Sequence, residues 1–221
     1  LWNTDYSRNF APTGYDRRHM FTLGWVYQIP VGKGRPVEVS NKLLGAIAGG
    51  WQVSGIFSKY SGLPFNVTGS GSSLRSAGNS QTADLVAPVT KIDTERGPNK
   101  PYYDPNSFQD PLVFFNQTGI YRYGTMGRNV LYGPGFFRVD PAIYKTFQIR
   151  ERVRAEFRAE GYNFTNTPRW NNPSASAAGP IRDSSGKITN LNNFMSITSV
   201  FGNNFGLDAG RQFRFAMRVQ F

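Results

Sequence analysis

The sequence predicts an all-β chain that forms a segment of an antiparallel transmembrane β-barrel, about five strands of a larger barrel with long extracellular loops. Three observations predict this fold. Residues 211–221 alternate apolar and polar side chains without interruption. Aromatic residues make up 15% of the 221 residues, a bias that strands and membrane-interface girdles share. The chain has no run of about 18 apolar residues, which excludes a transmembrane helix.

The final stretch has the length and polarity of a membrane strand. About 9–11 residues cross a bilayer, with apolar side chains toward lipid and polar ones toward the lumen. One face carries Phe213, Phe215, Met217, Val219 and Phe221, and the opposite face carries Gln212, Arg214, Arg218 and Gln220 with the small Ala216. Soluble domains usually finish in a polar tail, so an ending on Phe221 favours a barrel over a sandwich.

The first strand is predicted over residues 18–30, where every second side chain is apolar. Pro30 and the glycine-containing segment 31–36 end it. A short helix is predicted over 42–48, capped by Ser40 or Asn41 and released by the Gly49-Gly50 pair.

A second strand is predicted over 51–68, with a bulge or kink at Ser61-Gly62. From 69 to 135 the alternation fails, over a length far beyond an ordinary connection between packed elements. This segment is therefore expected to be functional, partly structured or disordered.

The third strand is predicted over 136–149, and Pro141 within it predicts a bulge or an unpaired N–H position. The Arg150-Glu151 turn leads to a fourth strand, 152–164, and a second long loop covers 165–205. If Phe221 lies at the periplasmic end, both long loops fall outside the cell and both shorter connections inside. Bacterial barrels sort their loops in this way.

Five strands cannot close a membrane barrel, for which about eight are needed. An open edge in lipid would leave unpaired backbone groups at several kcal/mol each. The whole chain, 1–221, is therefore expected to be one segment of a longer protein. It starts at Leu1 with no signal-peptide pattern, so a signal peptide and N-terminal domains are expected elsewhere.

Five segments carry a resemblance to a known family. They are Tyr60-Ser-Gly-Leu-Pro-Phe65, Gly127-Arg-Asn129, Gly133-Pro-Gly-Phe-Phe-Arg-Val-Asp140, the segment from Phe157 to Trp170 and the segment from Gly210 to Phe221. Their order and spacing resemble TonB-dependent receptors of the Oar-like type, over nearly the whole chain. The resemblance implies the C-terminal part of a barrel of about 22 strands, with a plug domain that this chain does not contain.

The resemblance also implies function and partners. It implies energised uptake of an unidentified ligand through the bacterial outer membrane, driven by the TonB complex through the plug. Expected partners are outer-membrane lipid, the plug, the remaining barrel strands and the barrel assembly machinery. The residues Gly210, Phe213, Phe215 and Phe221 are similar to the signal that this machinery reads. Some Oar-like members look more like adhesion or secretion proteins, so the direction of transport stays open.

Charged side chains alternate along the fourth strand. Arg154, Glu156, Arg158 and Glu160 share one face and are expected to meet Arg214 and Arg218 on the lumen side, where they help to hold the plug. We call these six residues the charge ladder. Glu156 and Glu160 lie about 13 Å apart on a strand, too far for the paired carboxylates of a glycosidase. The single histidine, His19, has no triad partners nearby in sequence, and no enzyme activity is expected.

No cofactor or metal is expected. The chain lacks cysteine, and the Asp104–Asp110 segment has oxygen ligands but lacks the glycine and glutamate of an EF-hand, so loop calcium binding stays open. The net charge of +11 is spread along the chain without a nucleic-acid motif, so nucleic acid is not an expected partner.

A ligand, carbohydrate or peptide, is expected to meet the outer loops. The candidate residues are Tyr102, Tyr103, Tyr121, Tyr123 and Arg128. The alternative for these aromatics is that they pack the loop against itself. The alternative for the whole chain is a secreted β-sandwich that binds carbohydrate or another surface partner.

Overall fold

The computed structural model describes residues 5–32, 34–75, 81–92, 95–150, 152–202 and 210–221. These residues form two compact units. The sheet unit comprises residues 19–60, 136–169 and 201–221, and the loop unit comprises residues 1–18, 61–135 and 170–200.

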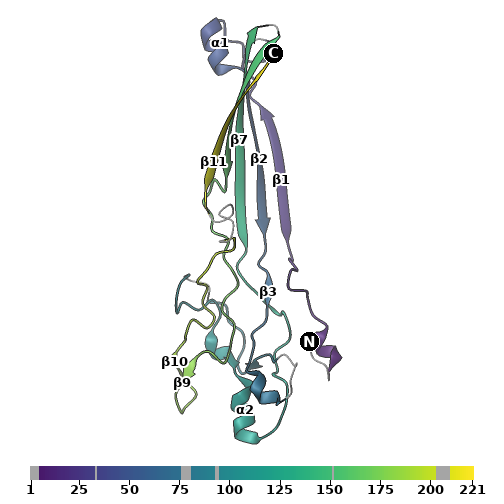
Figure 1. Cartoon of the computed structure of the whole chain (residues 1–221), viewed down its shortest axis with the longest axis vertical. Helices are drawn as coiled ribbons and strands as arrows, with labels where there is room; N and C mark the ends of the chain where they lie inside the picture. Colours follow the sequence, from purple (N-terminus) through teal and green to yellow (C-terminus); the bar gives the residue numbers. More distant parts are fainter. Residues whose placement is uncertain (1–4, 33, 76–80, 93–94, 151, 203–209) are drawn as a thin grey trace. The chain divides into compact units, whose positions relative to one another are not determined.

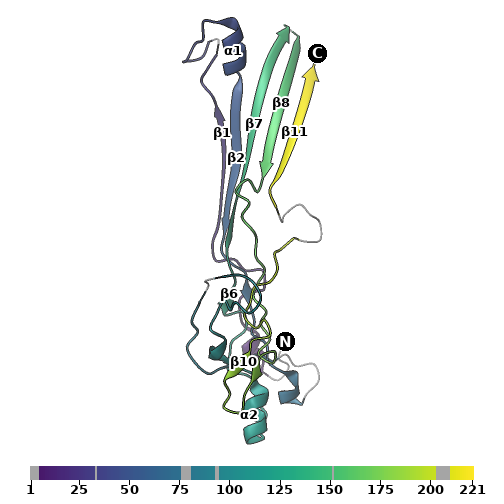
Figure 2. The same ribbon diagram turned by 90° about the vertical axis from the view of Figure 1, so that its left-hand side faces the viewer.

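The sheet unit is built on one antiparallel sheet (Figures 1 and 2). Its strands are β1 (Met20–Gln28), β2 (Trp51–Tyr60), β7 (Phe136–Arg150), β8 (Val153–Tyr162) and β11 (Gln212–Gln220). Their order in the sheet is β1-β2-β7-β8-β11, so every neighbour is also the next long strand in the chain. This meander of antiparallel neighbours confirms the predicted fold class.

The second strand is shorter than predicted. β2 ends at Tyr60, and of the bulge or kink predicted at Ser61-Gly62 the bulge is wrong, because the register with β7 has no shift up to Tyr60. The chain leaves the sheet at these two residues, which agrees with the kink. A Cβ on Gly62 would lie 1.8 Å from the carbonyl oxygen of Gly133, so this close approach requires glycine. Beyond it, β3 (Pro64–Phe65) pairs with β6 (Leu131–Tyr132) in a separate two-stranded ladder.

Pro141 on β7 interrupts neither the ladder with β2 nor the ladder with β8. The register between β2 and β7 runs without a shift from Tyr60 to Trp51, and the ladder between β7 and β8 begins at Ala142. Pro141 therefore lies just outside the ladder to β8, where its missing N–H costs no hydrogen bond. The shift in register occurs near the turn, between Gln148 and Arg150, and the predicted turn residue Glu151 lies outside the described residues.

The connector between β1 and β2 contains α1 (Lys42–Ala48), as the sequence predicts. Asn41 is the N-cap, and its side-chain oxygen accepts hydrogen bonds from the N–H groups of Leu43 and Leu44. Gly49 follows the last helical residue, and its N–H donates to the Gly45 carbonyl at 2.9 Å.

The two faces of the sheet differ in polarity. Cross-strand partners share a face, so the strand register assigns each side chain to one of the two. The apolar face carries Phe21, Leu23, Trp25, Tyr27, Val53, Phe57, Val139, Ile143, Phe147, Phe157, Phe213, Phe215, Met217 and Val219. Within the described sheet unit no second sheet covers this face, and Phe215 and Met217 are 68% and 71% exposed. A sandwich would bury these side chains, so the exposure argues against the soluble alternative.

The long loops are structured rather than disordered in their described parts. The elements of the loop unit are η1 (Tyr6–Asn9), β3, η2 (Gly71–Leu74), β4 (Asp84–Leu85), η3 (Pro105–Ser107), β5 (Phe108–Gln109), α2 (Pro111–Thr118), β6, β9 (Ile181–Arg182) and β10 (Ile188–Asn190). β4 pairs with β5, and β9 pairs with β10. Residues from both loops share one core, which contains Val67, Tyr102, Phe108, Met195 and Ile197 among others.

Candidate functional site

The polar face of the sheet concentrates charge around Glu160. Arg214 is its cross-strand partner on β11, and its Nη1 lies 3.9 Å from the Glu160 Oε2. Arg158 lies on β8 like Glu160, and its Nη1 is 3.3 Å from the other carboxylate oxygen, Oε1. The hydroxyl of Tyr162 donates a hydrogen bond of 2.8 Å to Oε2. Two cations and one donor therefore converge on a single carboxylate.

The register places the rest of the charge ladder on the same face. Arg218 lies opposite Glu156, and Arg154 lies opposite Gln220. Charged groups thus occupy successive levels of the β8–β11 pair, all directed away from the apolar side. Opposite charges at directly paired positions stabilise an antiparallel sheet modestly, by about 0.2–1 kcal/mol per pair.

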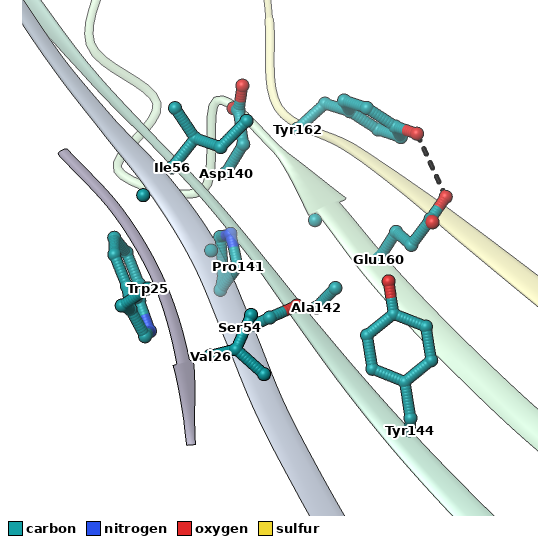
Figure 3. Close-up of a pocket in the computed structure, with 13 residues that line it drawn as sticks. Trp25, Val26, Ser54, Ile56, Asp140, Pro141, Ala142, Tyr144, Glu160 and Tyr162 are labelled. Carbon is teal, nitrogen blue, oxygen red and sulfur yellow. Dashed lines mark hydrogen bonds between the residues drawn. The ribbon is translucent and has the colours of Figure 1, made fainter. Parts of the chain in front are cut away.

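A hollow of about 470 Å³ lies beside the Glu160 cluster (Figure 3). Small residues of three neighbouring strands, Gly24, Ser54 and Ala142, leave this space open. Tyr144, Glu160, Tyr162 and Asp140 line the β7–β8 side. Hydroxyl and carboxylate groups next to small side chains can hydrogen-bond a polar polypeptide segment or a hydroxylated ligand.

A second hollow, of about 490 Å³, is more polar. Gln28, Gln52, Thr146, Glu156 and Arg158 are among its lining residues, together with Tyr144, which both hollows share. The guanidinium of Arg158 lies 4.8 Å from the ring centroid of Tyr144. The two hollows therefore border the same tyrosine on the polar face.

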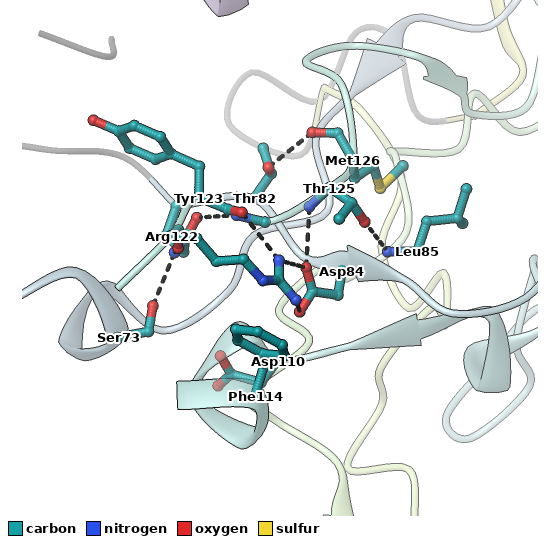
Figure 4. A network of polar contacts seen from close by, with 12 residues as sticks. Ser73, Thr82, Asp84, Leu85, Asp110, Phe114, Arg122, Tyr123, Thr125 and Met126 are labelled. Atoms are coloured by element: carbon teal, nitrogen blue, oxygen red, sulfur yellow. Dashed lines mark hydrogen bonds and ion pairs between the residues drawn. The ribbon is translucent and has the colours of Figure 1, made fainter. Parts of the chain in front are cut away.

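The loop unit contains an ion pair between a buried carboxylate and a half-buried guanidinium, which sequence reasoning missed (Figure 4). Arg122 donates two hydrogen bonds to Asp84, from Nη1 to Oδ1 at 2.6 Å and from Nη2 to Oδ2 at 2.9 Å. The Thr125 N–H also donates to Oδ1, at 3.0 Å. The guanidinium lies over the Phe114 ring of α2, 3.8 Å from its centroid. This network joins β4, α2 and the segment that returns to β6.

The predicted ligand aromatics divide into two groups. Tyr102 and Tyr103 are buried in the loop core, with ring centroids 5.1 Å apart in an edge-to-face arrangement, so they expose little surface to a ligand. They pack the loop against itself, the alternative that the sequence left open. Tyr121 is exposed and packs on Phe115, with the ring centroids 4.8 Å apart.

The remaining predicted ligand residues lie close to η1. Tyr123 is half-buried, with the Arg8 guanidinium 5.3 Å from its ring centroid. Arg128 is half-buried at a hollow of about 270 Å³ that Phe10 and Pro12 also line. Of the five predicted ligand residues, Tyr121, Tyr123 and Arg128 thus keep surface that a ligand could reach.

The carboxylates of the suspected calcium segment cap helices. Asp104 accepts the Asn106 N–H at the start of η3, and Asp110 accepts the Leu112 N–H at the start of α2 and that of Ser70. Among the described residues there is no group of three or more His, Cys, Asp or Glu side chains that could hold a metal ion. Within those same residues, no helix is long and apolar enough to cross a bilayer.

The predicted assembly-signal residues lie on or beside β11. Phe213 packs edge-on against Phe164, and Phe215 stacks with Phe157, with ring centroids 6.2 Å and 6.4 Å apart. Gly210 lies two residues before the start of β11, and Phe221 is fully exposed.

Two of the sequence motifs meet in the sheet unit. The Asp140 carboxylate accepts hydrogen bonds from Arg138 Nε, at 2.7 Å, and from the Asn163 N–H, also at 2.7 Å. Asn163 has a φ of 48°, a conformation that asparagine tolerates better than most residues. The motif around residue 140 therefore positions the motif around residue 163 at the end of β8.

Comparison with known proteins gives one family. A family model described as an outer membrane beta barrel domain matches residues 2–214. No curated protein and no solved structure matches the chain.

Proposed function

We propose that this chain, which belongs to the outer membrane beta barrel domain family, forms part of the barrel of a TonB-dependent receptor that takes up a polar ligand. As a member of that family, the chain resides in the bacterial outer membrane. The uptake function, the ligand and the dependence on TonB are the content of the proposal.

The observation that carries the proposal is the two-faced sheet. In an outer-membrane barrel the apolar face contacts lipid, so the opposite face lines the lumen. That face bears the charge ladder and both hollows, which suit a polar plug or a polar ligand. A barrel filled by a plug needs such groups on its inner wall.

The edges of the sheet support a larger barrel. Within the described residues, β1 and β11 each have one neighbour, so each leaves one row of backbone N–H and C=O groups without a strand partner. In hydrocarbon each unsatisfied group costs several kcal/mol. We therefore propose that further strands of a larger protein pair with both edges, for a total of about 22.

Dependence on TonB rests on the resemblance of the motifs to Oar-like receptors. The structure gives these motifs consistent roles: Gly62 and Gly133 pack backbone against backbone, and Asp140 holds the Asn163 amide. In the proposed receptor the TonB complex acts on the plug. The barrel assembly machinery reads the β11 segment with Gly210, Phe213, Phe215 and Phe221. The chain itself has no catalytic part in this scheme and needs no cofactor, metal or nucleic acid.

The test is uptake by cells that produce the full-length protein. Fluorescent oligosaccharides and fluorescent short peptides are offered with and without a protonophore that collapses the inner-membrane proton gradient. The proposal predicts accumulation of at least one probe class that the protonophore abolishes. Surface binding without energised accumulation would contradict uptake and favour an adhesion role. Cells without the protein provide the control.

A further inference from the structure

Lys145 breaks the polarity pattern of β7. It shares the apolar face with Ile143 and Phe147, where an ammonium group in lipid would be costly. Its side chain is nevertheless only 1% exposed. A basic residue placed toward hydrocarbon and then fully covered needs a specific partner.

The partner is the C-terminal end of α1. Lys145 Nζ donates hydrogen bonds to the carbonyl oxygens of Ala46 and Ile47, each at 2.8 Å, and to that of Gly49. The last carbonyl groups of a helix lack partners within it and carry partial negative charge, so an ammonium group satisfies both requirements. The indole N–H of Trp51 also donates to the Ile47 carbonyl, at 2.9 Å. Trp51 and Lys145 are cross-strand partners on the apolar face.

Residues 43–48 of α1 present an apolar and exposed surface. Leu43, Leu44 and Ile47 are 76%, 57% and 67% exposed, and residues 43–48 contain no charged side chain. Figure 2 shows the helix beside the end of the sheet where β1 leads to β2. The carbonyl groups of Ala46, Ile47 and Gly49 are bonded to Lys145 or Trp51, which lowers the cost of moving this end of the helix out of water.

We propose that α1 is an interfacial membrane helix, held on the lipid-facing side of the barrel by Lys145, with Leu43, Leu44 and Ile47 inserted into the adjoining phospholipid leaflet. Lipid is the occupant because the apolar surface of α1 continues the apolar face of the sheet, which contacts lipid in this family. Interfacial helices lie with their apolar side buried at the boundary of headgroups and acyl chains. Lys145 extends its long apolar stem along the sheet and places its charge at that boundary. In the orientation expected from the loops, this leaflet is the periplasmic one. The inference does not depend on transport.

The experiment measures the depth of a fluorescent probe in lipid. The 221 residues contain no cysteine, so single cysteines can be introduced into the full-length protein after any cysteine elsewhere has been replaced. Ile47→Cys reports on α1, Met217→Cys on the apolar face, and Ile120→Cys, an exposed isoleucine of the loop unit, serves as the matched control. Each labelled protein is reconstituted in vesicles of phosphatidylethanolamine and phosphatidylglycerol whose acyl chains are brominated near the carbonyl or near the methyl end.

The proposal predicts that lipid bromine quenches the probe at Ile47→Cys, most strongly from the carbonyl end, at a depth of about 5–10 Å below the headgroups. The Ile120→Cys probe should stay unquenched and the Met217→Cys probe should be quenched. Adding Lys145→Met to Ile47→Cys should reduce the quenching at Ile47, because the helix loses its attachment to the sheet. A probe at Ile47→Cys as unquenched as that at Ile120→Cys would overturn the inserted helix. Quenching that Lys145→Met leaves unchanged would overturn the role of Lys145. Heat-dependent migration on gels verifies that each variant has a folded barrel.

Discussion

Replacing Asp84 with alanine should loosen the loop unit. The Asp84 carboxylate is 4% exposed and accepts two hydrogen bonds from Arg122 and one from the Thr125 N–H. The bidentate arrangement is the strongest form of an arginine–carboxylate contact. Since β4 contains Asp84 and pairs with β5, loss of this residue affects the segment that leads into α2.

The size of the effect follows from burial. Breaking a fully buried ion pair by removing one partner costs about 3–5 kcal/mol. The Arg122 side chain is 31% exposed, so water can recover part of its lost hydrogen bonding, whereas the Thr125 N–H loses its acceptor. We therefore expect Asp84→Ala to destabilise the local structure by about 3 kcal/mol, which is about a 100-fold rise in the open population.

Hydrogen exchange of the membrane-reconstituted protein measures this opening directly, in peptides that cover β4, β5 and α2. Glu95→Ala is the matched control, because Glu95 forms an ion pair with Lys100 in which both side chains are exposed, Glu95 by 60% and Lys100 by 53%. Such exposed pairs contribute little to stability, because water and salt screen the two charges. An Asp84→Ala variant whose loop amides exchange no faster than those of Glu95→Ala would refute the reasoning.

Two further substitutions test the close approach and the charge cluster. Gly62→Ala should cost about 1–3 kcal/mol through its clash with the Gly133 carbonyl and should expose the loop base to protease. Gly71→Ala, which meets no atom within 4 Å, should not, and equal cleavage of the two variants would contradict the account. Glu160→Lys should lower the temperature at which heating changes the gel migration of the folded barrel. The introduced lysine, Arg158 and Arg214 then form a group of three cations with no carboxylate between them. Glu160→Gln, of similar size, should lower that temperature less; a reversed order would exclude charge as the cause.

Residue alternation was sufficient to predict the sheet, because its signal is local. The exposed apolar residues of β1 and β11 recur with period two, and no distant contact decides their direction. The sequence signal for α1 is equally local, because Asn41 caps the start of the helix and Gly49 follows its last residue. These features required no knowledge of what the strands pack against.

The loop unit could not be predicted, because contacts between distant segments build it. Its strands are two or three residues long, too short for a period to appear. Tyr102, which the sequence suggested for a ligand, is buried in a core that also contains Met195, more than ninety positions away. The Asp84–Arg122 pair likewise has no signature in sequence. Lys145 did have one, as a cation in the apolar phase of β7, but its helix partner is set by the tertiary fold.

The central claim is that the apolar face of the sheet contacts lipid, and spin labels along β11 test it most directly. Labels placed singly at residues 212–220 of the reconstituted protein are relaxed by oxygen, which partitions into lipid, and by a water-soluble nickel complex. The account predicts period-two profiles in opposite phase, with lipid contact at Phe213, Phe215, Met217 and Val219 and water access at the alternate positions. If labels at these four residues were shielded from both reagents, as beneath a second sheet, the account would be contradicted.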